Sequence, residues 1–233
     1  MTTNLLKGMT KTIKTIVVLS QIFIFITACH QNKKDEAIGM PSISKIKIER
    51  YRVTNEKKDT LTLSSYIIKE FDSLGNEVRS IYYTKEDSIM MQFENSYTHG
   101  NKTKVTWRNK NNVIVRYVNM TYNKDGKIIK SESFKADGKF VEGYLHRWKD
   151  NGKIEEKGPL NDSIFRPNSI YSYTDFNEFE TLIEYDLVND SLYGQFQWKY
   201  TEFDSNKNWL NREVYFNEKL TSLEKREIKY LAD

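Results

Sequence analysis

Tyr122-Asn-Lys-Asp-Gly-Lys-Ile-Ile-Lys-Ser-Glu-Ser-Phe134 shows most clearly the local pattern that predicts the fold. An aromatic residue closes one apolar run, a polar cluster that contains Gly126 follows, and a second run opens at Ile128. Asn, Asp and Gly tolerate the positive φ that a tight turn between antiparallel strands demands. The stretch therefore predicts a β-hairpin.

The same pattern recurs along the chain at a nearly constant spacing. Its leading aromatic residues lie 25 to 28 residues apart by subtraction of their numbers, and a fixed period in this range indicates a repeat array. The turns vary: Phe176-Asn-Glu-Phe179 has no Gly, and in the turn that follows Phe203 we expect Asn206 to take the positive φ instead. The leading aromatic residues are Phe71, Tyr97, Tyr122, Trp148, Phe176, Phe203 and Tyr230.

Runs suited to β-strands fill the chain from Ile46 to Leu231, and no helix of convincing length is found. We therefore predict an all-β fold, an extended antiparallel sheet of repeated β-hairpins with a period of about 26 residues. Whether the sheet stays open or rolls up is not decided by the pattern, and neither is the oligomeric state. The predicted domains are a lipoprotein signal peptide at 1-28, a flexible tether at 29-43 and a single β-repeat domain at 44-233.

The composition argues against nucleic-acid binding. The whole chain has 36 Lys and Arg against 32 Asp and Glu, a net charge of +4, and three of those lysines precede Cys29. The chain from Cys29 onward is therefore nearly neutral and gives no support for the concentrated basic face that nucleic acids require. A single cysteine also excludes an intramolecular disulfide.

The first 28 residues have the features of a secretory signal peptide. Lysines precede an apolar run from Ile16 through Ile26, and the small residue Ala28 ends the segment. The apolar run is too short to span a bilayer comfortably. The start of translation is Met1 or Met9, because both starts keep a positively charged leader.

The segment Ile26-Thr-Ala-Cys29 resembles the bacterial lipobox, and the only cysteine of the chain stands where that motif needs it. The resemblance implies lipidation of Cys29 and cleavage before it, and several acyl chains would anchor the protein stably in a membrane. The following Lys34-Asp-Glu36 resembles the lipoprotein export signal of Bacteroidetes, with a plain charged linker as the alternative. The implied location is the outer membrane, facing the cell surface or the periplasm.

The turns themselves resemble known repeats. Those at Phe71 to Asn76 and Tyr122 to Lys127 resemble degenerate YD repeats of the RHS type, and the segment from Gly138 to Gly158 resembles the MORN-variant repeat. The segment from Tyr200 to Tyr215 is similar to the tail of repeat lipoproteins common in Bacteroidetes. These resemblances cover about residues 66 to 230. They imply an extended sheet of stacked hairpins, while the toxin shell of full-length RHS proteins does not carry over to so short a chain.

Groups suited to catalysis or metal binding are few. His30 lies in the tether, His99 in a turn and His146 on a strand, and none has a second His or Cys at metal-ligand spacing. We interpret His146 as an ordinary strand histidine, and we predict no catalytic residue, no metal and no cofactor. We expect a protein that is not an enzyme; a hydrolase that uses scattered carboxylates is the alternative.

Aromatic residues are the larger surplus in this sequence. An exposed group of them would bind glycans or peptides by stacking, and packing across neighbouring strands is the alternative explanation. The candidate ligand-binding residues are Trp107, Tyr117, Tyr171, Tyr173, Trp198, Tyr200 and Trp209.

Five Asp-Ser/Thr-aliphatic triplets resemble the acceptor motif of the Bacteroidetes O-glycosylation system. The candidate acceptors are Thr60, Ser73, Ser88, Ser163 and Ser191.

Together these features predict a membrane-anchored repeat lipoprotein that acts as a binding or scaffold module on the cell envelope. Its anchor is Cys29 and its partner is a glycan or a protein. A purely structural envelope component is a further alternative.

Overall fold

The computed structural model describes residues 42–53, 61–162, 164–175, 178–185 and 191–231. The predicted signal peptide, Cys29 and the tether up to residue 41 lie outside these residues, as does the predicted turn at Phe176-Asn177.

The described chain is built from strands that follow one another along the sequence. One short 3-10 helix, η1 (Asp150–Gly152), interrupts them. The strands are β1 (Ile43–Val53), β2 (Leu61–Phe71), β3 (Glu77–Thr84), β4 (Ile89–Thr98), β5 (Asn101–Asn109), β6 (Ile114–Tyr122), β7 (Ile128–Lys135), β8 (Phe140–Lys149), β9 (Ile154–Pro159), β10 (Ser169–Tyr173), β11 (Phe179–Tyr185), β12 (Leu192–Phe203), β13 (Trp209–Phe216) and β14 (Lys219–Tyr230).

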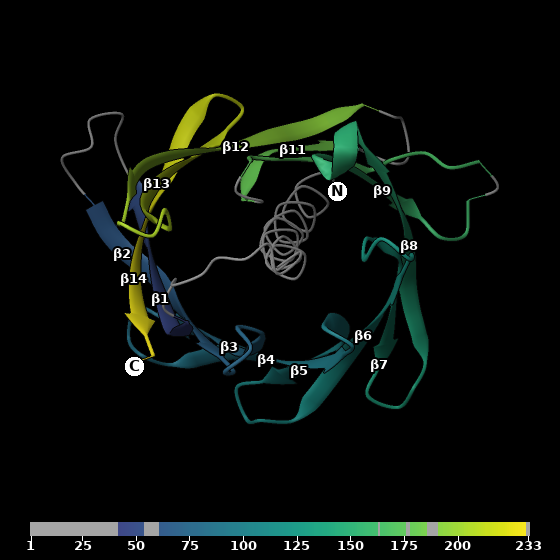
Figure 1. Ribbon diagram of the computed structural model, residues 1–233, viewed down its shortest axis with the longest axis horizontal. Coiled ribbons are helices and arrows are strands. Elements are labelled where there is room, and N and C mark those ends of the chain that lie inside the picture. Colours follow the sequence, from purple (N-terminus) through teal and green to yellow (C-terminus); the bar gives the residue numbers. More distant parts are fainter. Residues whose placement is uncertain (1–41, 54–60, 163, 176–177, 186–190, 232–233) are drawn as a thin grey trace, which may run out of the picture. The chain divides into compact units, whose positions relative to one another are not determined.

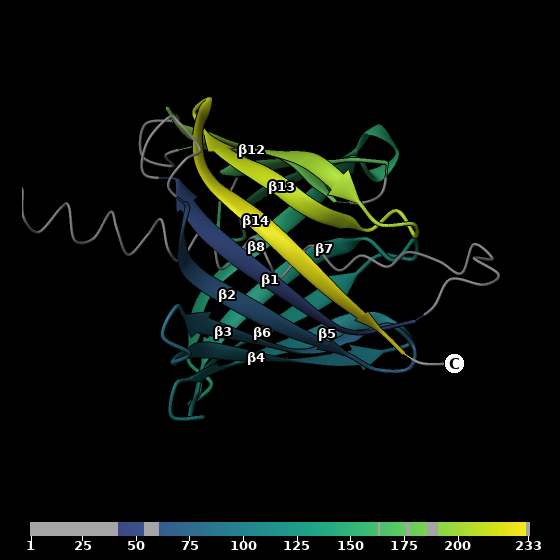
Figure 2. The same cartoon turned by 90° about the vertical axis from the view of Figure 1, so that its left-hand side faces the viewer.

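The sheet closes into a barrel. Every strand pairs antiparallel with its neighbours in sequence, as the hairpin pattern predicts, and β1 also pairs with β14. Figure 1 shows the strands as a ring, and Figure 2 shows β1 and β14 side by side across the wall. The all-β antiparallel prediction is therefore confirmed. The extended sheet is wrong, because the first and last strands share a continuous ladder from Ile46 opposite Ile228 to Arg52 opposite Ser222.

The repeated turns gather at one end of this barrel. The chain alternates in direction, so the turns that follow β2, β4, β6, β8, β10 and β12 share one end, called the repeat end below. In the turn after β2, the Asp72 carboxylate accepts hydrogen bonds from the backbone N–H groups of Leu74 and Asn76, and Gly75 has φ of 79°. This is a tight hairpin loop with one left-handed residue next to a bulge.

The turn after β12 has the same geometry with a different left-handed residue. The Asp204 carboxylate accepts from the N–H groups of Asn206 and Asn208, as Asp72 does in its own turn. Lys207 has φ of 63°, so the expectation that Asn206 takes the positive φ is wrong. The turn keeps its shape because the hydrogen bonds of the aspartate side chain fix which residue is left-handed. This is the fourth residue counted from the aspartate, Gly75 in one turn and Lys207 in the other.

A polar atom on four aromatic residues at the repeat end helps to explain why the period exists. At the end of an even-numbered strand, the ring hydroxyl or indole N–H donates to the backbone carbonyl that opens the preceding odd-numbered strand. Each such bond ties the two strands of one repeat together at the repeat end. The pairs are Tyr97 with Glu77 at 2.9 Å, Tyr122 with Lys102 at 2.7 Å, Trp148 with Ile128 at 2.7 Å and Tyr200 with Phe179 at 2.6 Å. In β12 two successive register shifts follow Tyr200, which makes this bond in place of Phe203.

The two faces of the wall differ in what they carry. Residues opposite each other in a ladder share a face, and the inner face combines buried apolar residues such as Ile46 and Leu182 with buried charges. Lys69 and Glu77, for example, form a buried inner pair at 2.8 Å. The outer face carries charges in mid-strand, such as Lys47 and Glu49 of β1.

A buried ion cluster joins the three strands at the seam of the barrel. One oxygen of Glu224 on β14 lies 2.8 Å from Nε and 2.7 Å from Nη2 of Arg50 on β1 and accepts from this guanidinium group. The other oxygen accepts from Arg212 of β13 at 2.7 and 2.6 Å. Burial alone raises the pKa of Glu224, but the two guanidinium groups outweigh it and hold that pKa at about 2. The carboxylate is 1% exposed, so removing its charge leaves two arginines without their counter-ion.

Glu224→Gln should lower the free energy of unfolding at pH 7 by ~3–5 kcal/mol, because it breaks a buried ion cluster from one side. The matched control is Glu94→Gln on the outer face, where the Arg108 pair is half exposed and a loss below about 1 kcal/mol is expected. Urea denaturation measures both variants. Equal losses in the two would contradict the assigned role of the seam.

The same cluster sets a pH dependence. Because the pKa of Glu224 is lower in the folded state than its ordinary value of 4.5, its ionised carboxylate stabilises the fold at pH values above 4.5. This contribution of roughly 3 kcal/mol is lost as the pH falls toward 2. The Glu224→Gln variant should lack this part of the acid sensitivity.

Candidate functional site

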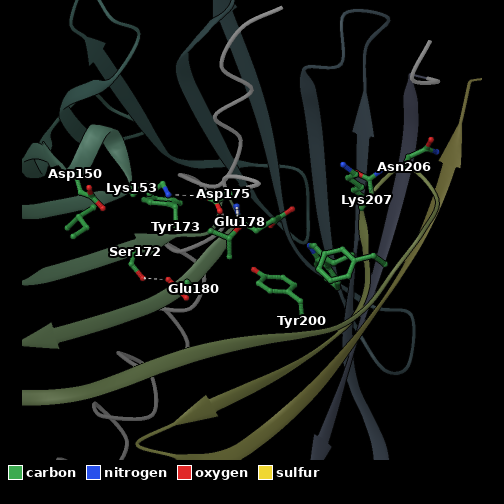
Figure 3. Close-up of a pocket in the computed structure, with 15 residues that line it drawn as sticks. Asp150, Lys153, Ser172, Tyr173, Asp175, Glu178, Glu180, Tyr200, Asn206 and Lys207 are labelled. Atoms are coloured by element: carbon green, nitrogen blue, oxygen red, sulfur yellow. Dashed lines mark hydrogen bonds and ion pairs between the residues drawn. The ribbon is translucent and has the colours of Figure 1, made fainter. Parts of the chain in front are cut away.

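The repeat end holds a cavity of about 730 Å³. Three neighbouring connections form its rim: η1 between β8 and β9, the β10–β11 turn and the β12–β13 turn. Figure 3 shows the lining side chains converging from these elements. The site is thus built from the same turns that the repeat period predicts, brought together by the curvature of the wall.

Aromatic residues form one side of the cavity. Trp209 is 2% exposed. The guanidinium groups of Arg212 and Arg226 lie over its ring, with their Cζ atoms 4.2 and 4.9 Å from the ring centroid. Phe203 is 44% exposed, so part of its ring faces solvent at the cavity. Tyr200 lies between them, in contact with both rings.

Charged residues form the other side, with four acids (Asp150, Asp175, Glu178 and Glu180) and two lysines (Lys153 and Lys207). Lys153 and Asp175 make an ion pair at 2.5 Å, and this hydrogen bond lowers the pKa of Asp175 and raises that of Lys153. Glu178 lies 3.6 Å from Arg226. Amide side chains of the β12–β13 turn add both donors and acceptors, so the wall offers mixed polarity with an excess of acidic groups.

A buried hydrogen-bond network lies directly behind this wall. Tyr173 lines the cavity, and its hydroxyl donates to the Glu155 carboxylate at 2.5 Å. The other Glu155 oxygen lies 2.5 Å from Nδ1 of His146, which is 5% exposed. Burial alone raises the pKa of Glu155, but the hydrogen bonds from His146 and Tyr173 hold it below its ordinary value. His146 is therefore part of a buried ionisable network, which its isolation in the sequence did not reveal.

The seven predicted aromatic residues do not form one surface. Tyr173, Tyr200 and Trp209 line the cavity, although Tyr173 and Trp209 are buried. Trp107, Tyr171 and Trp198 are buried on the inner face, and Tyr117 stacks on Phe134 with ring centroids 5.3 Å apart. Sequence reasoning did not single out Phe203 as a ligand contact, although its place before a repeat turn was a usable signal.

The predicted modification sites fall into two groups. Ser73, Ser88 and Ser191 lie in exposed connections between strands. Thr60, Ser163 and Cys29 lie outside the described residues.

Two further features concern the described residues alone. They contain no group of three or more His, Cys, Asp or Glu side chains that could hold a metal ion. Within the same part of the chain, no helix is both long and apolar enough to cross a membrane.

Comparisons with known proteins add little at this level. No protein-family model matches the chain, and no curated protein matches it either. Among solved structures, the chain is similar to a porin-like protein from Bacteroides uniformis, with 12% identity, a TM-score of 0.49, and coverage of 82% of this chain and 100% of that one. A DUF1329 family protein from Desulfovibrio piger is similar with 10% identity, a TM-score of 0.36, and coverage of 82% and 88%.

Proposed function

We propose that the chain is an envelope lipoprotein, anchored in the outer membrane through Cys29, whose barrel is a binding module with its ligand site in the repeat-end cavity. The observation that carries this proposal is the cavity itself. Its volume of about 730 Å³ falls within the range of small-molecule sites, roughly 300–1,000 Å³. Its wall combines an exposed aromatic ring with convergent polar groups, which is the usual makeup of such sites.

The outer wall supports a tethered barrel over one that crosses the bilayer. Membrane-spanning barrels present an apolar band to lipid, and charges near its middle cost about 2–4 kcal/mol each. Here Lys47 and Glu49 stand in the middle of β1, and Lys130 and Glu132 stand on the outer face of β7. A lipid anchor at Cys29 would hold such a barrel at a membrane without burying these charges.

The chemistry of the wall favours a glycan as the ligand. Each sugar hydroxyl both donates and accepts, and the cavity supplies both kinds of partner from Asn206, Asn208 and the Lys153–Asp175 pair. The ring of Phe203 offers an apolar surface against which the C–H face of a sugar can lie. Acidic residues outnumber lysines in the lining, which disfavours a strongly anionic ligand and leaves a neutral glycan compatible with the wall.

Isothermal titration with maltotetraose, cellotetraose and chitotetraose tests this ligand class. At least one should bind the wild-type protein, and Phe203→Ala should raise its Kd about threefold to tenfold by removing the stacking surface. Leu74→Ala is the matched control, since Leu74 is an 81% exposed apolar residue of another turn at the repeat end, outside the cavity. Binding by none of the three, or equal loss in both variants, would contradict a glycan site in the cavity.

Labelled palmitate and protease shaving of intact cells test the anchor. Wild type should incorporate the label and Cys29→Ala should not, because Cys29 is the only thiol of the chain. Label retained in the variant would refute lipidation at this residue. Shaving of the labelled protein from whole cells assigns it to the surface, and protection assigns it to the periplasmic side.

A further inference from the structure

Three inner-face side chains on adjacent strands form a relay, and Tyr173 links its carboxylate to the cavity wall. The Oγ of Ser131 on β7 lies 2.9 Å from Nε2 of His146 on β8. Nδ1 of the same ring lies 2.5 Å from the carboxylate of Glu155 on β9. Hydroxyl, imidazole and carboxylate thus stand in the order and at the distances of a nucleophile, a general base and the group that orients the base.

The carboxylate determines which way the hydrogen bonds of this relay run. Glu155 accepts from Tyr173 on one oxygen, and as an ionised group it can only accept on the other. Nδ1 of His146 therefore carries the proton of that bond. In the neutral ring Nε2 is then left with its lone pair, which accepts the hydroxyl proton of Ser131.

The neighbours of Ser131 suit a developing negative charge. Tyr144 stands directly opposite Ser131 in the ladder, and Nζ of Lys157 lies 4.1 Å from the centroid of its ring. Lys157 itself stands opposite His146. Lys157 is thus a buried amine on the same inner face as Ser131, and an ammonium in such a setting can stabilise an oxyanion far better than one in water.

We propose that Ser131, His146 and Glu155 are a catalytic triad that hydrolyses a carboxylic ester with a small acyl group. Ser131 is 8% exposed among packed side chains, and this confinement is the reason for a small acyl group. Lys157 stabilises the oxyanion, and Tyr173 is a positioning residue that holds Glu155. This assignment stands independently of whether the cavity binds a glycan.

The reaction proceeds in two balanced steps. Oγ of Ser131 attacks the ester carbonyl carbon while its proton passes to Nε2 of His146, and the leaving alcohol takes that proton as the ester C–O bond breaks. Water then attacks the acyl-serine and gives a proton to Nε2, which returns it to Oγ as the acyl bond breaks. The products are the free alcohol and the carboxylic acid, and water is the sole co-reactant.

Covalent labelling of the full, processed chain tests the nucleophile directly. A biotinylated fluorophosphonate should attach to Ser131 in the wild type, as located by peptide mass mapping, and Ser131→Ala should abolish the label. Ser133→Ala is the matched control, because Ser133 is a 3% exposed serine of the same strand and face whose hydroxyl contacts Arg116. His146→Gln should slow labelling at least about a hundredfold, since it removes the base.

Kinetics with p-nitrophenyl acetate separate catalysis from mere structure. Ser131→Ala should lower kcat/KM about 10³-fold or more, and Ser133→Ala should leave it within about threefold of wild type. Tyr173→Phe should lower kcat with KM unchanged, as expected for a residue that acts through Glu155. Circular dichroism melting checks that each variant folds. If His146→Gln does not fold, the comparison of Ser131→Ala with Ser133→Ala still tests the triad. Absence of label on wild type, label on another serine, or equal activity of the two serine variants would overturn the triad.

Discussion

Closure of the ring at the β1–β14 seam pairs the first and last strands of the sheet and determines which side chains face inward. An open meander would leave the backbone of two edge strands unpaired, and such edges invite pairing with other chains. Here the ladder between the first and last strands removes both edges, and Glu224 joins Arg50 and Arg212 across the seam. The buried carboxylate is stabilised only while all three strands are in place, so closure and the ion cluster support each other.

Closure also decides where chemistry can occur. Once the sheet is a ring, alternate side chains face inward, and polar groups there must find partners in the protein. Lys69 with Glu77 and Arg212 with Glu224 show how charges on this inner face find partners. The cavity and the Ser131 relay both belong to the sector from β7 to β13, where three turns converge above the inner polar network. Tyr173 belongs to both, through its ring in the cavity wall and its hydroxyl on Glu155.

Much of this fold can be read from local sequence, and the reason is that it is made of local hairpins. The turn at Asn123 to Lys127 and the aromatic period depend on residues within one repeat, so strand positions and pairing order follow from them. The closed ring could not be predicted in this way, because it depends on the register of strands at opposite ends of the chain. Short-range patterns carry no information on whether curvature brings those strands together.

The candidate site was less predictable for the same physical reason. Ser131 lies fifteen positions before His146 and Glu155 nine positions after it, so no short motif connects the three. Their shared inner face follows only from the bulged register. The aromatic surplus pointed to Tyr173, Tyr200 and Trp209, but composition alone could not show that Arg212 and Arg226 cover the Trp209 ring. Register shifts follow Tyr200 in β12, so Tyr200 rather than Phe203 contacts the backbone carbonyl of Phe179, and Phe203 stays exposed.

The most direct test of the closed ring is a distance across its seam. Lys47 of β1 and Glu227 of β14 stand opposite each other on the outer face, so nitroxide labels introduced as Lys47→Cys and Glu227→Cys, in a chain that also carries Cys29→Ala, report closure. A closed ring should give strong dipolar broadening of the electron paramagnetic resonance spectrum, because opposed residues have Cα atoms about 5 Å apart. An open sheet of the same strands would separate the labels by roughly 60 Å at about 4.8 Å per strand, and a spectrum without broadening would contradict the barrel.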